Sequence, residues 1–202
     1  RICCDCAQQA AAEEVRAGAP PQPGAPAGQL TRVYANGSSY TGQCRDGARS
    51  GRGVQAWPDG ALYDGEWEGD RANGEGRFRH ADGDVYEGGW CNDKAHGRGV
   101  YSHGRGGRYS GEWRDDRQHG HGEETWPDGS SYAGQYREGL RAGAGRFAWA
   151  EEAYEGEFLG SELHGRGAYR WEDGRGYEGQ WRRGQMHGEG AFRWPDGRGY
   201  EG

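Results

Sequence analysis

The sequence has 202 residues, and its composition narrows the classes of protein it can be. Glycine accounts for 42 residues and hydrophobic residues for only 32%, so a conventional two-layer core of aliphatic side chains is not expected. Twelve tyrosines, nine tryptophans and four phenylalanines argue against a disordered chain, because such chains are poor in aromatics. The net charge of −7 argues against a nucleic-acid binder, which would carry a basic surplus.

Residues 1–29 differ from the rest and predict a flexible segment that contains cysteines. The stretch AGAPPQPGAPAG is rich in proline, alanine and glycine, which is typical of a linker. Cys3 and Cys6 form a C-x-x-C pair around Cys4; the end of an upstream zinc module, an acylation site and unmodified thiols all stay open. Cys44 and Cys91 stand alone. This cysteine pattern fits a reduced, cytoplasmic setting better than a disulfide scaffold.

From Tyr40 onward the sequence is an internal repeat. A tyrosine returns every 23 residues, with one step of 22 between Tyr132 and Tyr154. Each unit reads approximately Y-x-G-x-W-x-x-G-x-x-H-G-x-G-x-x-x-W-x-D-G-x-x. The predicted array covers residues 30–202, as a partial unit 30–39, seven units at 40–62, 63–85, 86–108, 109–131, 132–153, 154–176 and 177–199, and a truncated unit 200–202.

The alternation within a unit predicts a β-hairpin. In Y-x-G-x-W every second residue points to one face of a strand, and the G-x-G-x-F half alternates in the same way. The D-G pair then turns the chain into the next unit. Because a large ring needs a flat place to lie, we expect each ring to cover glycines on neighbouring strands. The predicted fold is all-β, an elongated single-layer antiparallel meander of tandem 23-residue hairpins.

This unit resembles the MORN (membrane occupation and recognition nexus) repeat, over about residues 40–202. The resemblance implies a non-enzymatic scaffold for protein–protein interaction or assembly, as in cytoskeletal, ciliary and cortical MORN proteins. The predicted partners are proteins, with self-association as a further option. The candidate interaction groove consists of the aromatic residues at the first and fifth positions of each unit, Tyr63, Trp67, Tyr86, Trp90, Tyr109, Trp113, Tyr132, Tyr136, Tyr154, Phe158, Tyr177 and Trp181.

Two alternatives stay open at this point. The first is a module apposed to a membrane, since the resemblance also covers membrane-junction proteins. Its candidate contacts with anionic lipid are Arg105, Arg108, Arg182 and Arg183, although the array is acidic and has no polybasic run. The second is a regulatory array of a larger enzyme, such as a phosphatidylinositol phosphate kinase, whose catalytic domain lies outside this sequence.

No pattern predicts catalysis, a cofactor or a small-molecule substrate. The repeated histidines His96, His119, His164 and His187 would lie about 10 Å apart if each unit adds two strands, too far to share one zinc ion. The glycine-rich stretches lack the strand–turn–helix context of a phosphate loop. The paired carboxylates alternate on the solvated face. We therefore expect no metal site, no nucleic-acid partner and no enzymatic activity in this chain.

Overall fold

The structure is a computed structural model that describes residues 29–202. The predicted flexible segment with Cys3, Cys4 and Cys6 lies outside the described residues. By contacts between Cα atoms the chain divides into two compact units. The first runs up to Gly104 and includes Trp113–Arg117; the second comprises Arg105–Glu112 and Gln118–Gly202.

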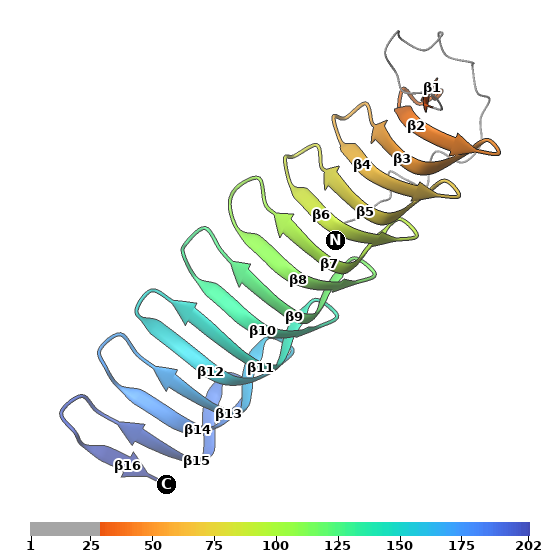
Figure 1. Cartoon of the computed structure of the whole chain (residues 1–202). Helices are drawn as coiled ribbons and strands as arrows, with labels where there is room; N and C mark the ends of the chain where they lie inside the picture. The colour runs from red at the N-terminus through yellow and green to blue at the C-terminus, as the bar shows by residue number, and fades with distance from the viewer. Residues whose placement is uncertain (1–28) are drawn as a thin grey trace. The chain divides into compact units, whose positions relative to one another are not determined.

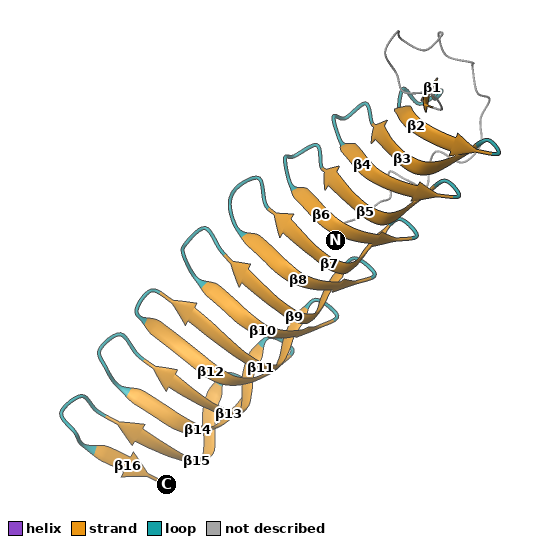
Figure 2. Ribbon diagram, in the orientation of Figure 1, coloured by secondary structure: helices purple, strands orange, loops and turns teal. Residues whose placement is uncertain are grey.

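The described residues form one antiparallel sheet of sixteen strands and contain no helix. Each strand pairs with its neighbours in the sequence, so the order in the sheet is the order in the chain (Figures 1 and 2). The predicted fold class, an all-β single sheet of sequential hairpins, is confirmed. The strands are β1 (Gln29–Val33), β2 (Ser39–Arg45), β3 (Ala48–Ala56), β4 (Leu62–Glu68), β5 (Arg71–Arg79), β6 (Val85–Cys91), β7 (Lys94–Ser102), β8 (Arg108–Arg114), β9 (Arg117–Thr125), β10 (Ser131–Arg137), β11 (Leu140–Trp149), β12 (Glu152–Leu159), β13 (Glu162–Arg170), β14 (Gly176–Arg182), β15 (Gln185–Arg193) and β16 (Gly199–Glu201).

Glycines face one another across the strands and make room for the tyrosine rings. Gly65 on β4 pairs with Gly76 on β5, and the ring of Tyr63 lies over this pair. A Cβ atom built on Gly65 would be 2.6 Å from the Cα of Gly76 and 2.7 Å from the Cζ of Tyr63. Because real Cβ atoms do not approach so closely, the ring packs there only against glycine. The predicted ring-on-glycine packing is present.

The tyrosine hydroxyl completes each hairpin. Tyr63 donates a hydrogen bond to the backbone carbonyl of Glu66 at 3.0 Å, three residues further along its own strand. The register of the β4–β5 pair shifts between Gly65 and Trp67, so Glu66 occupies the bulge, where ladder pairing is disrupted. The same bond recurs for the first tyrosine of every complete unit, at 2.6–3.1 Å.

Tryptophan at the fifth position links one hairpin to the preceding one. The indole of Trp67 donates to the carbonyl of Gly53 at 3.0 Å, and Trp181 donates to Gly167 at the same distance. In the D-G turns, which join one unit to the next, the aspartate side chain closes the turn. The carboxylate of Asp59, for example, accepts from the backbone N–H of Ala61 at 3.0 Å. Hairpins therefore depend on their neighbours for satisfied polar groups as well as for packing.

Candidate functional site

The twelve rings proposed as an interaction groove form the core of the sheet. Each of them is at most 7% exposed. Within the array a tyrosine meets tryptophans edge-on, as Tyr63 does with Trp67 at 5.0 Å and with Trp90 at 5.2 Å between ring centroids. Rings buried to this extent expose little area to a partner. Their role as a binding surface stays a prediction.

A second series of rings on the same face is partly exposed. These rings stand at the sixteenth and eighteenth positions of the units, opposite the buried tyrosines: Tyr169 pairs with Tyr154, and Phe192 with Tyr177. In the second compact unit seven of them follow one another without a gap. We call this series the aromatic ladder; it consists of Trp126, Phe147, Trp149, Tyr169, Trp171, Phe192 and Trp194, all of intermediate exposure.

The rings of the aromatic ladder contact one another in sequence. Their centroids lie 5.4 Å apart for Trp126 and Phe147, 4.9 Å for Phe147 and Trp149, and 5.4 Å for Trp149 and Tyr169. The next three steps, through Trp171 and Phe192 to Trp194, measure 4.4, 5.4 and 4.6 Å. The ladder is therefore one continuous apolar strip.

Charged side chains border the strip without interrupting it. The guanidinium of Arg175 lies 5.5 Å from the ring of Trp171 and pairs with Asp173 at 2.7 Å. Arg198 holds the same position beside Trp194. Tyr169 donates to the carboxylate of Glu152 at 2.5 Å, and burial together with this carboxylate raises its phenol pKa. Arg175 and Arg198 are thus paired with acids, whereas the guanidinium of Arg141 lies 4.7 Å from the ring of Phe147 and 6.0 Å from that of Trp126 and donates to the carbonyl of Ser161.

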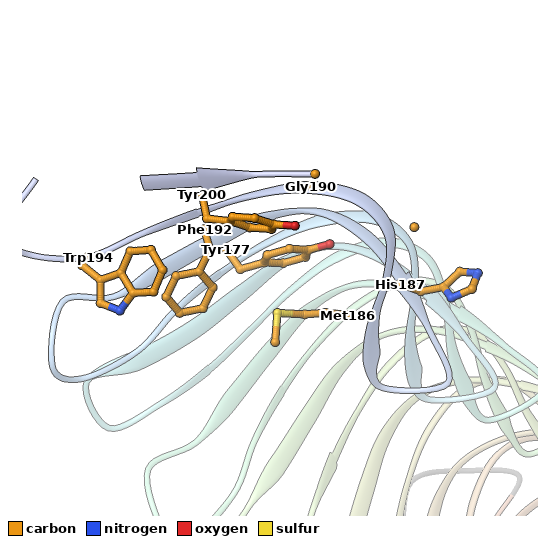
Figure 3. Close-up of a pocket in the computed structure, with 9 residues that line it drawn as sticks. Tyr177, Met186, His187, Gly190, Phe192, Trp194 and Tyr200 are labelled. Atoms are coloured by element: carbon orange, nitrogen blue, oxygen red, sulfur yellow. The ribbon is translucent and has the colours of Figure 1, made fainter. Parts of the chain in front are cut away.

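A pocket of about 540 Å³ lies at the C-terminal end of the aromatic ladder, lined by Phe192, Trp194, Tyr177, Met186 and Tyr200 among others. Figure 3 shows Tyr177, Phe192 and Met186 on the inner side of the curved strands. In the preceding unit the equivalent place holds Trp181, whose ring lies 5.4 Å from Tyr154 and 6.0 Å from Tyr169. Within the array, this place is therefore filled by the fifth-position ring of the following unit.

The first compact unit contains a shorter series that differs in chemistry. Trp57, Phe78, His80, Tyr101 and His103 succeed one another with centroids 4.4–6.3 Å apart. Two of these five rings are imidazoles, and Phe78 is only 3% exposed. Tyr101 donates to the carboxylate of Asp84 at 2.5 Å, and His103 lies 3.2 Å from the same carboxylate. This series is therefore more polar than the aromatic ladder.

The four predicted lipid contacts are exposed, but the structure does not bring them together. Arg105 lies in the turn between β7 and β8, with Arg108 at the start of β8, whereas Arg182 and Arg183 lie at the turn between β14 and β15. In a sequential antiparallel meander these two turns are at opposite edges of the sheet. A single cationic patch is not formed by them.

The described residues offer neither a metal cluster nor a spanning helix. Among residues 29–202 no group of three or more histidine, cysteine or acidic side chains is placed to hold a metal ion. In the same part of the chain there is no helix of the length and apolarity that a membrane span requires.

A family model described as the MORN repeat matches seven stretches of the chain, residues 40–62, 63–85, 86–108, 109–131, 132–151, 154–174 and 177–197. The chain belongs to the MORN repeat family. No curated protein matches this MORN array. The bulges, tyrosine hydroxyl bonds and glycine pairs described above are thus features of MORN units in this chain.

Solved structures with a similar course of the chain include domains of two proteins. One is the TCP domain of SAS-4 (dCPAP) from Drosophila melanogaster, solved in complex with a proline-rich motif of Ana2, with 14% identity, coverage of 91% of this chain and 96% of that one, and a TM-score of 0.46. The other is the TCP10 domain of Danio rerio CPAP, with 14% identity, coverage of 86% and 88%, and a TM-score of 0.43. Both TM-scores lie below 0.5, so the family assignment stands on the repeat sequence.

The aromatic ladder was not among the predicted site residues. The sequence does carry its signal, because Phe192 and Trp194 alternate with the G-x-G pair and so share its face. Alternation alone does not separate rings that the next hairpin covers from rings that it leaves open. The D-G turn that follows the eighteenth position is the remaining signal, since it places that residue near the edge of the sheet.

Proposed function

We propose that this MORN array is a non-enzymatic scaffold that binds an extended segment of a protein partner along the aromatic ladder. The observation that carries the proposal is the uninterrupted strip of seven partly exposed rings in the second compact unit. Large apolar strips on a soluble surface mark interaction sites. Tryptophan and tyrosine are the residues that most often dominate binding energy at such sites.

The form of the strip favours an extended ligand over a globular one. One ring follows the next in single file, and the charged pairs Asp173–Arg175 and Asp196–Arg198 border it. A narrow track of rings suits a peptide whose side chains meet the rings in succession.

The cellular setting that we propose is the cytoplasm, at a cytoskeletal, ciliary or cortical structure. This part of the proposal is supported by the MORN family alone. Imaging of the tagged full-length protein against tubulin, cilium and plasma-membrane markers tests it. A diffuse signal, or a purely membranous one, would contradict the placement.

A peptide-display selection on the full-length protein tests the ladder directly. We expect enriched peptides to bind the wild type and to lose at least about tenfold in affinity with the double variant Trp149→Ala/Trp171→Ala. The matched control is Arg146→Ser/Arg170→Ser, which alters exposed residues beside the ladder on the opposite face of β11 and β13. Peptides that bind the ladder variant as tightly as the wild type would refute the proposal.

Contact with anionic lipid is a second proposal, supported by the exposure of Arg105, Arg108, Arg182 and Arg183. Their separation to opposite edges and the net charge of −7 weaken it. Flotation with phosphoinositide-containing vesicles at low and physiological salt decides the matter. Salt-sensitive binding that is lost in the Arg182→Ser/Arg183→Ser variant would favour the membrane module over the protein scaffold.

A further inference from the structure

The repeat distance of the aromatic ladder matches that of one particular peptide conformation. Each MORN unit contributes two strands, and neighbouring strands lie about 4.8 Å apart, so one unit advances the ladder by about 9.6 Å. A polyproline II helix has three residues per turn and rises about 3.1 Å per residue, which gives about 9.3 Å per turn. A polyproline II segment that follows the ladder therefore presents the same edge to each successive unit.

This agreement holds over the length of the strip. The tryptophans of the eighteenth position, Trp126, Trp149, Trp171 and Trp194, mark four successive units. The mismatch of about 0.3 Å per unit accumulates to about 1 Å over the three steps between them. Ligands with proline at every third residue would thus place one proline ring near each tryptophan. Aromatic-lined tracks recognise proline-rich segments in this way.

The chain itself contains a segment with this spacing. Residues 19–26 read APPQPGAP, and Pro20, Pro23 and Pro26 stand three residues apart. Proline fixes φ near −65°, so such a sequence favours polyproline II. In a polyproline II helix, residues three apart share one edge, so Pro20, Pro23 and Pro26 form one series and Pro21 does not belong to it.

The charge of this segment also fits the strip. No charged residue occurs between Ala17 and Thr31, so the segment brings no charge of its own to the strip. On docking, the segment therefore buries no charge of its own, and burying charge is the costly part of burying surface. The blocks of acidic residues elsewhere in the chain lack this property.

We infer that the proline-rich segment Pro20–Pro26 of one copy of this chain docks on the aromatic ladder of a second copy. The inference rests on the proposed function of the ladder and names its occupant. A second copy is required because only Ala27 and Gly28 separate Pro26 from β1, whereas the ladder belongs to β9 through β15 in the sheet order. A segment-to-ladder contact is heterologous, so it joins copies head to tail and leaves each end open for a further copy.

The test compares the full-length wild type with two proline variants by sedimentation equilibrium. We expect the mass of the wild type to rise with concentration. We expect Pro20→Ala/Pro23→Ala/Pro26→Ala to associate at least about tenfold more weakly. Pro21→Ala is the matched control, because it removes a proline outside the three-residue series, and it should associate like the wild type. All four substitutions lie outside the described array, so they leave its fold intact.

Complementation identifies the two surfaces. The variant Trp149→Ala/Trp171→Ala keeps the proline-rich segment and loses the ladder. The triple proline variant keeps the ladder and loses the proline-rich segment. Neither should associate alone, and an equimolar mixture should form one-to-one complexes and nothing larger. In the indole region of the NMR spectrum, association should shift Trp149 and Trp171 and leave Trp57 unchanged.

Several results would overturn the inference. One is a wild type that stays monomeric at its highest soluble concentration; another is a triple proline variant that associates as the wild type does. A third is a monomeric wild type whose Trp149 and Trp171 indole signals in the NMR spectrum differ from those of the triple proline variant. That result would show that the segment docks on the ladder of its own chain, without a second copy. If the wild type is monomeric while selected peptides still need Trp149 and Trp171, this inference fails and the proposed function stands.

Discussion

Replacing Gly134 by valine tests the packing that builds every hairpin of the array. Gly134 lies on β10 opposite Gly145 on β11, beneath the ring of Tyr132. A Cβ atom at this position would be 2.5 Å from the Cα of Gly145, 2.5 Å from the Tyr132 hydroxyl and 2.8 Å from the carbonyl of Ala144. Two of these three neighbours are backbone atoms, so the strain cannot be relieved by rotating a side chain.

The expected cost follows from two contributions. Overpacking a well-filled site costs about 1–3 kcal/mol. Displacing the Tyr132 ring also breaks its hydroxyl bond to the carbonyl of Gln135, 2.9 Å long, and a hydrogen bond of this kind contributes about 1 kcal/mol. We therefore expect Gly134→Val to lower the free energy of unfolding by about 2–4 kcal/mol.

Urea unfolding followed by tryptophan fluorescence measures this loss. The matched control is Ala133→Val, which introduces the same side chain one residue earlier, at an exposed position on the opposite face. Surface substitutions of this kind change stability by about 0.5 kcal/mol or less. Equal urea midpoints for the two variants would refute the ring-on-glycine account.

Two further predictions concern single side chains. Tyr132→Phe removes the hydroxyl bond to the carbonyl of Gln135, and urea unfolding should show a free energy of unfolding lower by about 1 kcal/mol. The control Tyr200→Phe changes a residue that is 65% exposed and should have no effect. Equal losses in the two variants would contradict the role of the bulge. Burial lowers the pKa of His80 below its ordinary value of 6.5, although nearby carboxylates oppose the shift. The folded state therefore prefers the neutral imidazole, and stability is present above pH 6.5 and is lost as the pH falls toward the lower folded-state pKa. The thermal midpoint of the wild type should be higher at pH 7 than at pH 5, and His80→Trp should make this difference smaller. A difference as large as in the wild type would show that groups other than His80 cause the pH dependence.

The sheet was predictable because its rules are local and repeated. Alternation in Y-x-G-x-W places tyrosine, glycine and tryptophan on one face whatever the surrounding structure. The D-G pair requires a turn, and Gly60 indeed adopts a φ of +92° there. Recurrence in every unit then leaves one pairing order, in which each strand meets the next.

The exposure of the rings was not predictable in the same way. Tyr154 and Tyr169 are both aromatic, lie on one face and pair directly, yet only Tyr154 is fully buried. The difference arises because Phe158 on the same strand and Trp181 on β14, in the next unit, close over Tyr154. Burial thus depends on contacts between units, whereas alternation reports only the face of a single strand.

The fourth and fifth complete units each depart from the repeat at one position, and the two departures compensate for each other. Glu124 stands where most other units have phenylalanine or tyrosine, and Tyr136 where four units have tryptophan. The Tyr136 hydroxyl donates to the Glu124 carboxylate at 2.8 Å, and burial together with this carboxylate raises the phenol pKa. The hydroxyl therefore finds in Glu124 the acceptor that the indole of Trp113, for example, finds in the carbonyl of Gly99.

A double-mutant cycle tests whether Glu124 and Tyr136 stabilise the fold through their contact with each other. Glu124→Phe alone leaves the buried Tyr136 hydroxyl without its acceptor, which costs about 1–3 kcal/mol. Tyr136→Trp alone takes the donor away from Glu124. The double variant restores the ring pair of the other units, with the new indole facing the carbonyl of Gly122, and should be about as stable as the wild type. Each single loss should thus be recovered in the double variant, with a coupling energy of about 1 kcal/mol or more in urea unfolding. Additive losses would show that the two positions vary independently.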